Sequence, residues 1–405
     1  MLDDFGQRIR DIILSEMDLS RELSDEEICD LIGSVVSREA RDRPMTIKDR
    51  AELERTIFNS LRKLDVLQEL VDDRDVTEIM VNGPNDIFYE KAGRIQRFKG
   101  HFSSEEKLED VIQQIVGRHN RVVNQASPIV DTRLSDGSRV NIVLNPISIG
   151  GSAVSIRKFP EHPMSMERLV EIEALSPEVA RFLQILTQAK YNIFISGGTG
   201  SGKTTFLNAL SQYIPDDERI ITIEDSAELQ LLGAKNIVRL ETRNANTDGV
   251  TPITIRDLIR TALRMRPDRI IVGECRGAEA LDMLQAMNTG HDGSLSTGHA
   301  NSPHDIISRI ETMVLQGQDF PLNAIRQQIA SGIDIIVQLG RLRDKSRRVL
   351  EISEVDGFMD GEIVLHTLYR FEETAVLDSG RIQGFLKKAG TLCHTDKLMA
   401  AGLRV

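Results

Sequence analysis

Aromatic residues are scarce in this chain. Its 405 residues include no tryptophan, 4 tyrosines and 13 phenylalanines, and its formal net charge is −12. Proteins that hold single-stranded nucleic acid combine aromatic stacking platforms with a basic groove. The composition gives no sign of either feature, so we expect no nucleic-acid partner. A basic surface confined to one part of the chain is the alternative.

Cysteine is also rare, and Cys29, Cys275 and Cys393 lie far apart. The odd number argues against a secreted disulfide framework, and no Cys/His group has the spacing of a zinc site. The first residues lack the basic and apolar segments of a signal peptide. No uncharged apolar run is long enough to cross a bilayer. The sequence therefore predicts a cytoplasmic protein that reaches membranes only through partners.

Residues 1–64 are predicted to be helical, within a chain long enough for two or three domains. Ser24 and Glu27 have the spacing of a capping box, and apolar residues follow at helical intervals. A second helical stretch follows Pro44 and carries Leu53, Ile57, Phe58 and Leu61. We interpret the segment as a small bundle packed on itself, with a docking module for a partner as the alternative.

Residues 65–158 are predicted to form an α+β, PAS-like domain. Asp136-Gly137 is a hairpin turn signal between two alternating runs, and Asn82-Gly83 ends a β-rich run. The expected elements are strands at 76–83, 87–90 and 152–158, a helix at 105–121 and a hairpin at 133–143.

Beyond this domain, Pro160 and Pro163 disfavour regular structure, so residues 159–169 are expected to be a hinge linker. From 170 to 371 strands alternate with helices, which predicts an α/β domain with a mostly parallel sheet covered on both faces. The candidate strands are 192–196, 219–223, 236–240, 269–273 and 333–338. Residues 372–405 are expected to be a loosely ordered polar tail.

A glycine-rich stretch follows the first of these strands and precedes a helical pattern. The stretch is Gly197-Gly198-Thr199-Gly200-Ser201-Gly202-Lys203-Thr204-Thr205. Its spacing is that of a phosphate-binding P-loop, in which backbone N–H groups and the helix N-terminus surround phosphate. Lys203 is expected to bind the terminal phosphates, and the Thr204 hydroxyl is expected to ligate Mg²⁺. The predicted domain is therefore RecA-like, with ATP and Mg²⁺ as cofactors.

Acidic residues follow two other strands of this domain. Glu224 and Asp225 end the strand 219–223, Glu228 follows closely, and Glu274 comes just after 269–273. Ligands of open parallel sheets bind at the carboxyl ends of strands, where the P-loop also lies. Such carboxylates hold Mg²⁺ or activate the attacking water. Solvated acids without a catalytic role are the alternative.

Two histidines and three arginines complete the candidate site. His291 and His299 lie in a stretch rich in small residues and could sense the γ-phosphate or join a subunit boundary. Metal ligation suits them poorly, because no further ligand lies at helical spacing. Arg133, Arg139 and Arg157 precede the P-loop domain, and phosphoryl transfer often takes an arginine from another domain or subunit. Surface salt bridges are the alternative for each arginine.

Four stretches in order resemble the Walker A, Asp box, Walker B and His box of secretion superfamily ATPases. They are GGTGSGKTT (197–205), TIEDSAEL (222–229), RPDRIIVGECRG (266–277) and TGHDGSLSTGHANS (289–302). Residues 76–95 and 131–141 resemble those of the Flp/tight-adherence pilus branch, the CpaF-type assembly ATPases. The resemblance covers about residues 65–371.

The resemblance implies a role for each site residue. Glu228 matches the Asp-box glutamate proposed as general base, with Glu224 as the alternative. Glu274 matches the Walker B glutamate and inherits the Mg²⁺ role, because Gly273 stands where many P-loop proteins have aspartate. His291 and His299 match the His box. Arg133, Arg139 and Arg157 resemble the arginines that approach the phosphates. The zinc-binding tetracysteine motif of some relatives is missing, so no zinc is expected.

The resemblance also implies a hexameric, cytoplasmic ATPase that works on an inner-membrane platform protein to assemble a pilus, with retraction by the same motor left open. Three alternatives stay open from the sequence. One is a type IV secretion or conjugation ATPase, and one is a RecA-like nucleic-acid translocase, whose ATPase activity DNA would stimulate. The third is a nucleotide-switched adaptor with little turnover, which the intact Glu228 and Glu274 disfavour.

Overall fold

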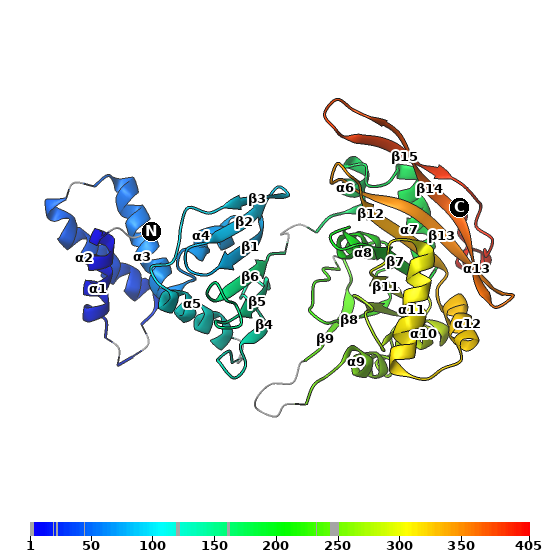
Figure 1. The fold of residues 1–405 in the computed structure, drawn as a ribbon, viewed down its shortest axis with the longest axis horizontal. Helices are drawn as coiled ribbons and strands as arrows, with labels where there is room; N and C mark the ends of the chain where they lie inside the picture. The colour runs from blue at the N-terminus through cyan, green and yellow to red at the C-terminus, as the bar shows by residue number, and fades with distance from the viewer. Residues whose placement is uncertain are drawn as a thin grey trace. The chain divides into compact units, whose positions relative to one another are not determined.

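The computed structural model describes residues 4–405 except 19, 22, 44, 119–121, 160–162, 232 and 244–250. The chain divides into two compact units, Met1–Glu161 and His162–Val405 (Figure 1). Within the described ranges, no helix combines the length and apolar character needed to span a bilayer.

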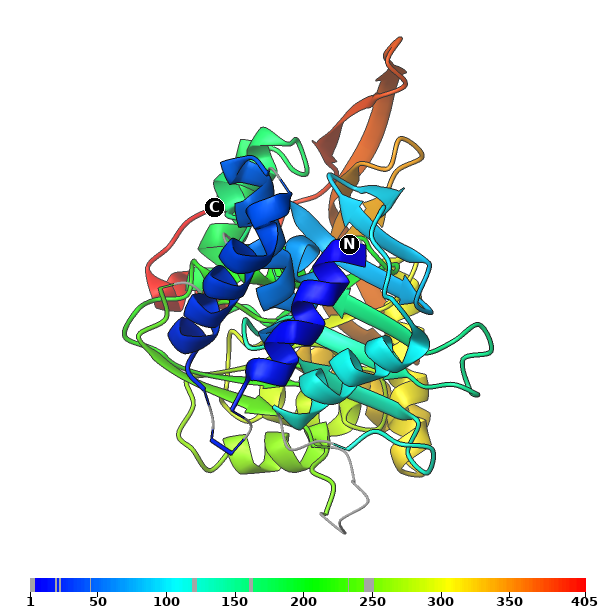
Figure 2. The same ribbon diagram turned by 90° about the vertical axis from the view of Figure 1, so that its left-hand side faces the viewer.

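The first unit begins with helices that pack on one another (Figure 2). These are α1 (Asp4–Glu16), α2 (Asp25–Glu39), the short 3₁₀ helix η1 (Ala40–Asp42) and α3 (Ile47–Arg62). The predicted capping box is present, because Ser24 Oγ accepts the Glu27 N–H while a Glu27 carboxylate oxygen accepts the Ser24 N–H. Apolar side chains of all three α-helices form a separate core that includes Ile9, Ile32 and Ile57. Pro44, expected to break the helical pattern, lies outside the described residues.

The rest of the first unit is an antiparallel sheet with two helices, as expected for an α+β domain. Its strand order is β3-β2-β1-β6-β5-β4. The elements are α4 (Leu67–Asp72), β1 (Val76–Asn82), β2 (Ile87–Lys91), β3 (Arg94–Arg97), α5 (Glu105–Gly117), β4 (Ile129–Arg133), β5 (Arg139–Val143) and β6 (Ala153–Arg157). Apolar residues of α4 and α5 share one core with alternate residues of the strands.

The second unit is built on a nine-stranded sheet with the order β15-β14-β13-β12-β7-β11-β10-β8-β9. Neighbouring strands are parallel from β12 to β9, as predicted, whereas β13, β14 and β15 extend the sheet antiparallel. The strands are β7 (Ile193–Gly197), β8 (Arg219–Glu224), β9 (Asn236–Glu241), β10 (Arg269–Val272), β11 (Leu295–Gly298), β12 (Ile335–Arg341), β13 (Arg347–Met359), β14 (Glu362–Val376) and β15 (Ile382–Lys388).

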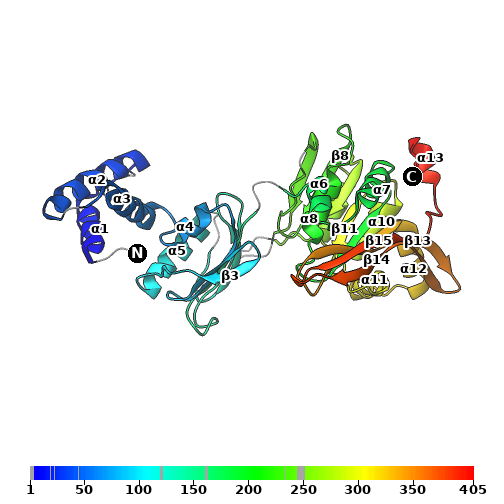
Figure 3. The same ribbon diagram turned by 90° about the horizontal axis from the view of Figure 1, so that it is seen from above.

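Helices cover both faces of the parallel part, which confirms the predicted α/β fold (Figure 3). The core on one face contains Ile193 and Ile195 of β7 together with residues of α6 (Met166–Glu171), α7 (Pro177–Gln188) and α8 (Lys203–Ser211). Phe194 points to the other face. That face is covered by α9 (Ile255–Ala262), α10 (Ala280–Asn288), α11 (Pro303–Gly317) and α12 (Leu322–Gly332).

Two expectations about segment boundaries need correction. The residues after 371 do not form a loose tail: β15 pairs with β14 along its length, and the terminal helix α13 (Asp396–Ala401) contributes the buried Leu398 to the core. The proposed linker 159–169 is shorter than expected, because Ser165 caps α6 and residues 166–169 are helical. Residues 160–162 of that linker lie outside the described residues.

Candidate functional site

The P-loop connects β7 to α8 at the carboxyl end of the parallel strands. Gly200 and Gly202 have φ values of +71° and +94°, which side-chain-bearing residues rarely adopt. The Nζ atom of Lys203 donates hydrogen bonds to the carbonyl oxygens of Gly197 and Gly198, both at 3.1 Å. The loop therefore curls around the ammonium group at the start of α8, as expected for a phosphate-binding loop.

Lys203 also contacts the histidine that follows β11. Its Nζ lies 3.1 Å from Nδ1 of His299. An ammonium group can only donate, so this Nδ1 accepts and the proton of a neutral ring resides on Nε2. The pKa of His299 is lowered, first by burial and then by the charge of Lys203, which favours that neutral form. Burial likewise lowers the pKa of Lys203.

Glu274 completes a chain of three groups at this edge of the sheet. Nε2 of His299 lies 2.8 Å from Oε1 of Glu274. The other oxygen, Oε2, accepts from Arg276 Nη2 at 2.6 Å. A continuous series of contacts thus joins the P-loop lysine, the second His-box histidine and the Walker B glutamate.

The site suits a magnesium ion bound together with phosphate. Thr204, half-buried in the first turn of α8, and the carboxylate of Glu274 supply hard oxygen ligands. Among the described residues, no three His, Cys, Asp or Glu side chains cluster closely enough to hold a metal ion by themselves. Thr204 and Glu274 fit Mg²⁺, which keeps most of its ligands as water and substrate phosphate.

Glu224 holds the Asp-box loop from its position at the end of β8. Its Oε2 accepts the backbone N–H groups of Glu228 at 2.7 Å and Leu229 at 2.8 Å. The side chain is 3% exposed, and burial raises its pKa to about 7 against the opposing effect of these two hydrogen bonds. The geometry makes Glu224 a positioning group for Glu228, which is half-buried.

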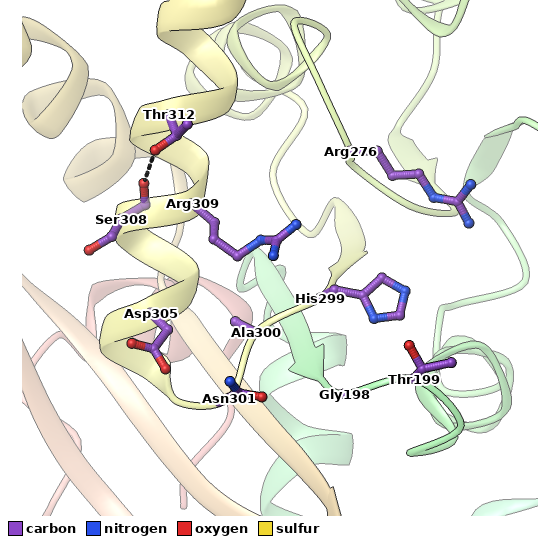
Figure 4. Close-up of a pocket in the computed structure, with 10 residues that line it drawn as sticks. All are labelled: Gly198, Thr199, Arg276, His299, Ala300, Asn301, Asp305, Ser308, Arg309 and Thr312. Atoms are coloured by element: carbon purple, nitrogen blue, oxygen red, sulfur yellow. Dashed lines mark hydrogen bonds between the residues drawn. The ribbon is translucent and has the colours of Figure 1, made fainter.

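A cavity of about 890 Å³ opens beside the P-loop. It is lined by Gly198, Thr199, Arg276, His299, Ala300, Asn301, Asp305, Ser308, Arg309 and Thr312 (Figure 4). The residues from α11 and Arg276 were missed from the sequence. Arg276 could have been noticed, because it follows the Walker B glutamate by two positions, whereas nothing in the pattern of α11 distinguishes Arg309.

Arg347 of β13 was missed as well. Its Nε donates to the carbonyl oxygen of Gly200 at 2.9 Å. The antiparallel extension of the sheet therefore supports the P-loop directly.

The three predicted arginines lie in register on neighbouring strands of the first unit. Arg133 of β4 is paired with Arg139 of β5, which is paired with Arg157 of β6. Directly opposed like charges destabilise a sheet, so this row is not explained by strand pairing alone. Asp131 offsets part of this repulsion, because its Oδ1 lies 3.8 Å from Nη2 of Arg139.

His291 lies apart from the other predicted site residues of the second unit. It precedes β11, whose first residue Leu295 is paired with Ile193 at the start of β7. His299 follows the end of β11, beside the P-loop. The two histidines are thus at opposite ends of one strand, and within this unit His291 does not join the phosphate site. Its Nδ1 lies 3.2 Å from the carbonyl oxygen of Ala286.

Comparison with known proteins gives matches along most of the chain. Residues 60–384 match the family model described as "Type II/IV secretion system protein". The type IV secretion system protein PtlH of Bordetella pertussis is 33% identical over 73% of this chain and 94% of its own length. The conjugal transfer protein TrbB of Rhizobium radiobacter is 31% identical over 81% of this chain and 98% of its own length.

A solved structure supports the fold. The crystal structure of the pilus retraction motor PilT with bound ADP superposes with a TM-score of 0.55 at 22% identity, covering 82% of this chain and 84% of that one. With the P-loop, the Walker B glutamate and the His-box histidine in contact at one sheet edge, these matches show that the chain is a P-loop ATPase of the type II/IV secretion system family.

Proposed function

We propose that this protein is the cytoplasmic ATPase motor of an Flp/tight-adherence type IV pilus. The observation that carries the ATPase part of the proposal is the contact series Lys203–His299–Glu274 beside the P-loop. The pilus branch is supported by the two sequence stretches at 76–95 and 131–141. Assembly is the proposed main activity, with retraction by the same motor as an extension of it.

In the proposed reaction, the terminal phosphates of ATP accept hydrogen bonds from Lys203 and from the P-loop backbone. When bound, Mg²⁺ neutralises developing phosphate charge, and Thr204 and Glu274 are the residues that would hold it. Glu228 is the proposed general base for the attacking water. The backbone N–H of Glu228 donates a hydrogen bond of 2.7 Å to Oε2 of Glu224. This bond holds the backbone that carries the proposed base.

The arginine row of the first unit is the proposed source of charge stabilisation from outside the P-loop unit. Arg133, Arg139 and Arg157 share one register across three strands, so they would present several cationic groups together. We propose that ATP binding draws them toward the phosphates and that hydrolysis releases them. The segment 159–169, shortened by the start of α6, is the proposed hinge.

The proposed working form is a ring of six copies that binds an inner-membrane platform protein from the cytoplasmic side. Cyclic closure of the units would move the platform protein and so insert pilin subunits. This arrangement places the protein peripheral to the inner membrane, attached only through its partner.

Replacement of Lys203 tests the ATPase part. Lys203→Ala removes the cation that would bind the terminal phosphates, so phosphate release should fall at least about a hundredfold. Arg168→Gln, which removes one exposed ion pair on α6, is the matched control and should leave the rate unchanged. Full activity of Lys203→Ala would mean that the P-loop is not the site of hydrolysis.

A type IV secretion or conjugation ATPase is the second candidate, because PtlH and TrbB carry those functions in their names. Deletion of the gene in its native host separates the two. Loss of surface pili with normal transfer of DNA and effector proteins supports the pilus motor. The reverse pattern supports the second candidate, and stimulation of the ATPase rate by DNA would favour a nucleic-acid translocase instead.

A further inference from the structure

Arg309 lies on α11, beside the nucleotide site, and it belongs to none of the four sequence boxes. It lines the cavity of about 890 Å³ together with His299 and Arg276. Figure 4 shows its guanidinium directed away from α11, toward His299. Asp305 lies one helical turn before Arg309, at a spacing that favours an ion pair. Nevertheless, no hydrogen bond joins the two among the residues drawn.

The other arginine that lines this cavity, Arg276, is already engaged. Its Nη2 donates to Oε2 of Glu274 at 2.6 Å. Among the described residues that line the cavity, Arg309 is therefore the arginine left available for an incoming anion. The charge of Arg309 also acts on His299, where it contributes to the lowered pKa of the ring.

The anion that this position fits is the terminal phosphate of a nucleoside triphosphate. His299 contacts Lys203 at 3.1 Å and Glu274 at 2.8 Å, so it marks the side of the P-loop where the terminal phosphate and the attacking water belong. The cavity extends from Gly198 and Thr199 of the loop to Arg309. A diphosphate held in the P-loop would end short of this side.

We infer that Arg309 contacts the γ-phosphate and makes the site distinguish ATP from ADP. This inference rests on the proposed ATP-binding function and adds a residue to it. Because the Arg309 side chain is exposed, keeping its charge costs little free energy when no nucleotide is bound. A bound γ-phosphate would draw α11 toward the P-loop, which couples the nucleotide state to a whole helix.

Affinities for ADP and for the non-hydrolysable analogue AMP-PNP test the inference, measured with Mg²⁺ by calorimetry on the full chain. In Arg309→Gln, AMP-PNP affinity should fall about tenfold, the loss expected for one charge-assisted hydrogen bond. ADP affinity should stay unchanged, which also shows that the variant is folded. Arg309→Lys should recover part of the AMP-PNP affinity, and Arg168→Gln should change neither.

Three results would overturn the inference. The first is unchanged affinity for both nucleotides in Arg309→Gln, and the second is an equal loss for both. The third is weaker self-association with an unchanged ratio of the two affinities, which would assign Arg309 to an acidic group of a second copy. Failure of the unmodified protein to bind either nucleotide would instead contradict the proposed ATPase function, so the two failures are distinguishable.

Discussion

At the scale of single residues, Glu224 and Gly273 occupy the space where β8 and β10 end. A Cβ atom added to Gly273 would lie 2.9 Å from Cγ of Glu224, which is closer than such carbons approach. Many P-loop proteins have an aspartate at this position of the Walker B strand. Here the Glu224 side chain fills that space, so the glycine is a steric requirement of the buried glutamate.

Glu224 and Glu228 are the two candidates for the general base, and substitution by glutamine separates them. Glu224→Gln keeps an oxygen that can accept the N–H groups of Glu228 and Leu229, so most of the activity should remain. Glu224→Ala loses this acceptor, and kcat should fall by about tenfold to a hundredfold. Glu228→Gln should lose about as much activity as removal of a general base does, 10²- to 10⁴-fold.

Phosphate-release rates at saturating ATP check these variants, with unchanged ADP affinity as the control for folding. If Glu224→Gln is as inactive as Glu228→Gln, Glu224 takes part in proton transfer and the positioning role is wrong.

The raised pKa of Glu224 predicts a pH-dependent stability. Burial raises this pKa from 4.5 to about 7, so the folded state binds the proton more tightly than the unfolded state. The stabilisation is complete below about pH 4.5 and is lost as the pH rises through 7, with a size on the order of 3 kcal/mol. Thermal unfolding from pH 5 to 8 should show this fall. Glu224→Gln should remove it, and an equally steep profile in that variant would contradict the assignment.

The site residues differ in how far sequence could place them. The P-loop and Glu274 follow strands with strong apolar runs, so their shared sheet edge could be predicted. His291 and His299 are close in the sequence. The strand β11 lies between them, however, so they are at opposite ends of the parallel strands. Arg309 reaches the site through the packing of α11, a tertiary contact for which the local sequence has no signal.

At the scale of elements, the C-terminal segment is part of the ATPase unit. Glu354 of β13 is 1% exposed, and its carboxylate accepts the backbone N–H groups of Cys393 and His394, both at 2.8 Å. Lys397 of α13 contacts Asp334 at 2.6 Å and Asp292 at 2.8 Å. The last residues therefore pair with one buried carboxylate, that of Glu354, and with two more exposed ones at the end of the sheet opposite the P-loop.

The sequence patterns did not indicate β14 and β15, and the reason is physical. Most residues of β14 and β15 are exposed or half-buried, so neither strand has a full apolar face of period two. Backbone pairing with β13 carries the extension of the sheet. The polar composition after residue 372 thus indicated a tail, although the segment contains the end of β14, all of β15 and α13.

Truncation tests the role of this segment. A chain ending at 389 leaves the buried Glu354 and the half-buried Asp334 without their C-terminal partners, and loss of the partner of a buried charge destabilises a fold by about 3–5 kcal/mol. The unfolding midpoint should fall by several degrees, and a chain ending at 371 should fold poorly. A chain ending at 403 is the control and should behave like the full protein. Equal midpoints for the 389 and full-length chains would contradict the structural role of α13.

At the scale of the whole molecule, the arginine row and the P-loop belong to separate compact units of one chain. The proposed motor needs both, because the arginine row would add cationic charge from outside the P-loop unit during phosphoryl transfer. In a ring, such arginines can also serve the site of a neighbouring copy. Catalysis would then depend on assembly.

The proposed motor hydrolyses ATP at this P-loop within an assembled ring. The most direct test is the steady-state ATPase rate per chain across a concentration series, with the assembly state measured by light scattering in the same samples. The rate per chain should rise as a ring of about six copies forms, as expected when a catalytic arginine is supplied in trans. Full activity in a monomer, at a rate independent of concentration, would contradict it.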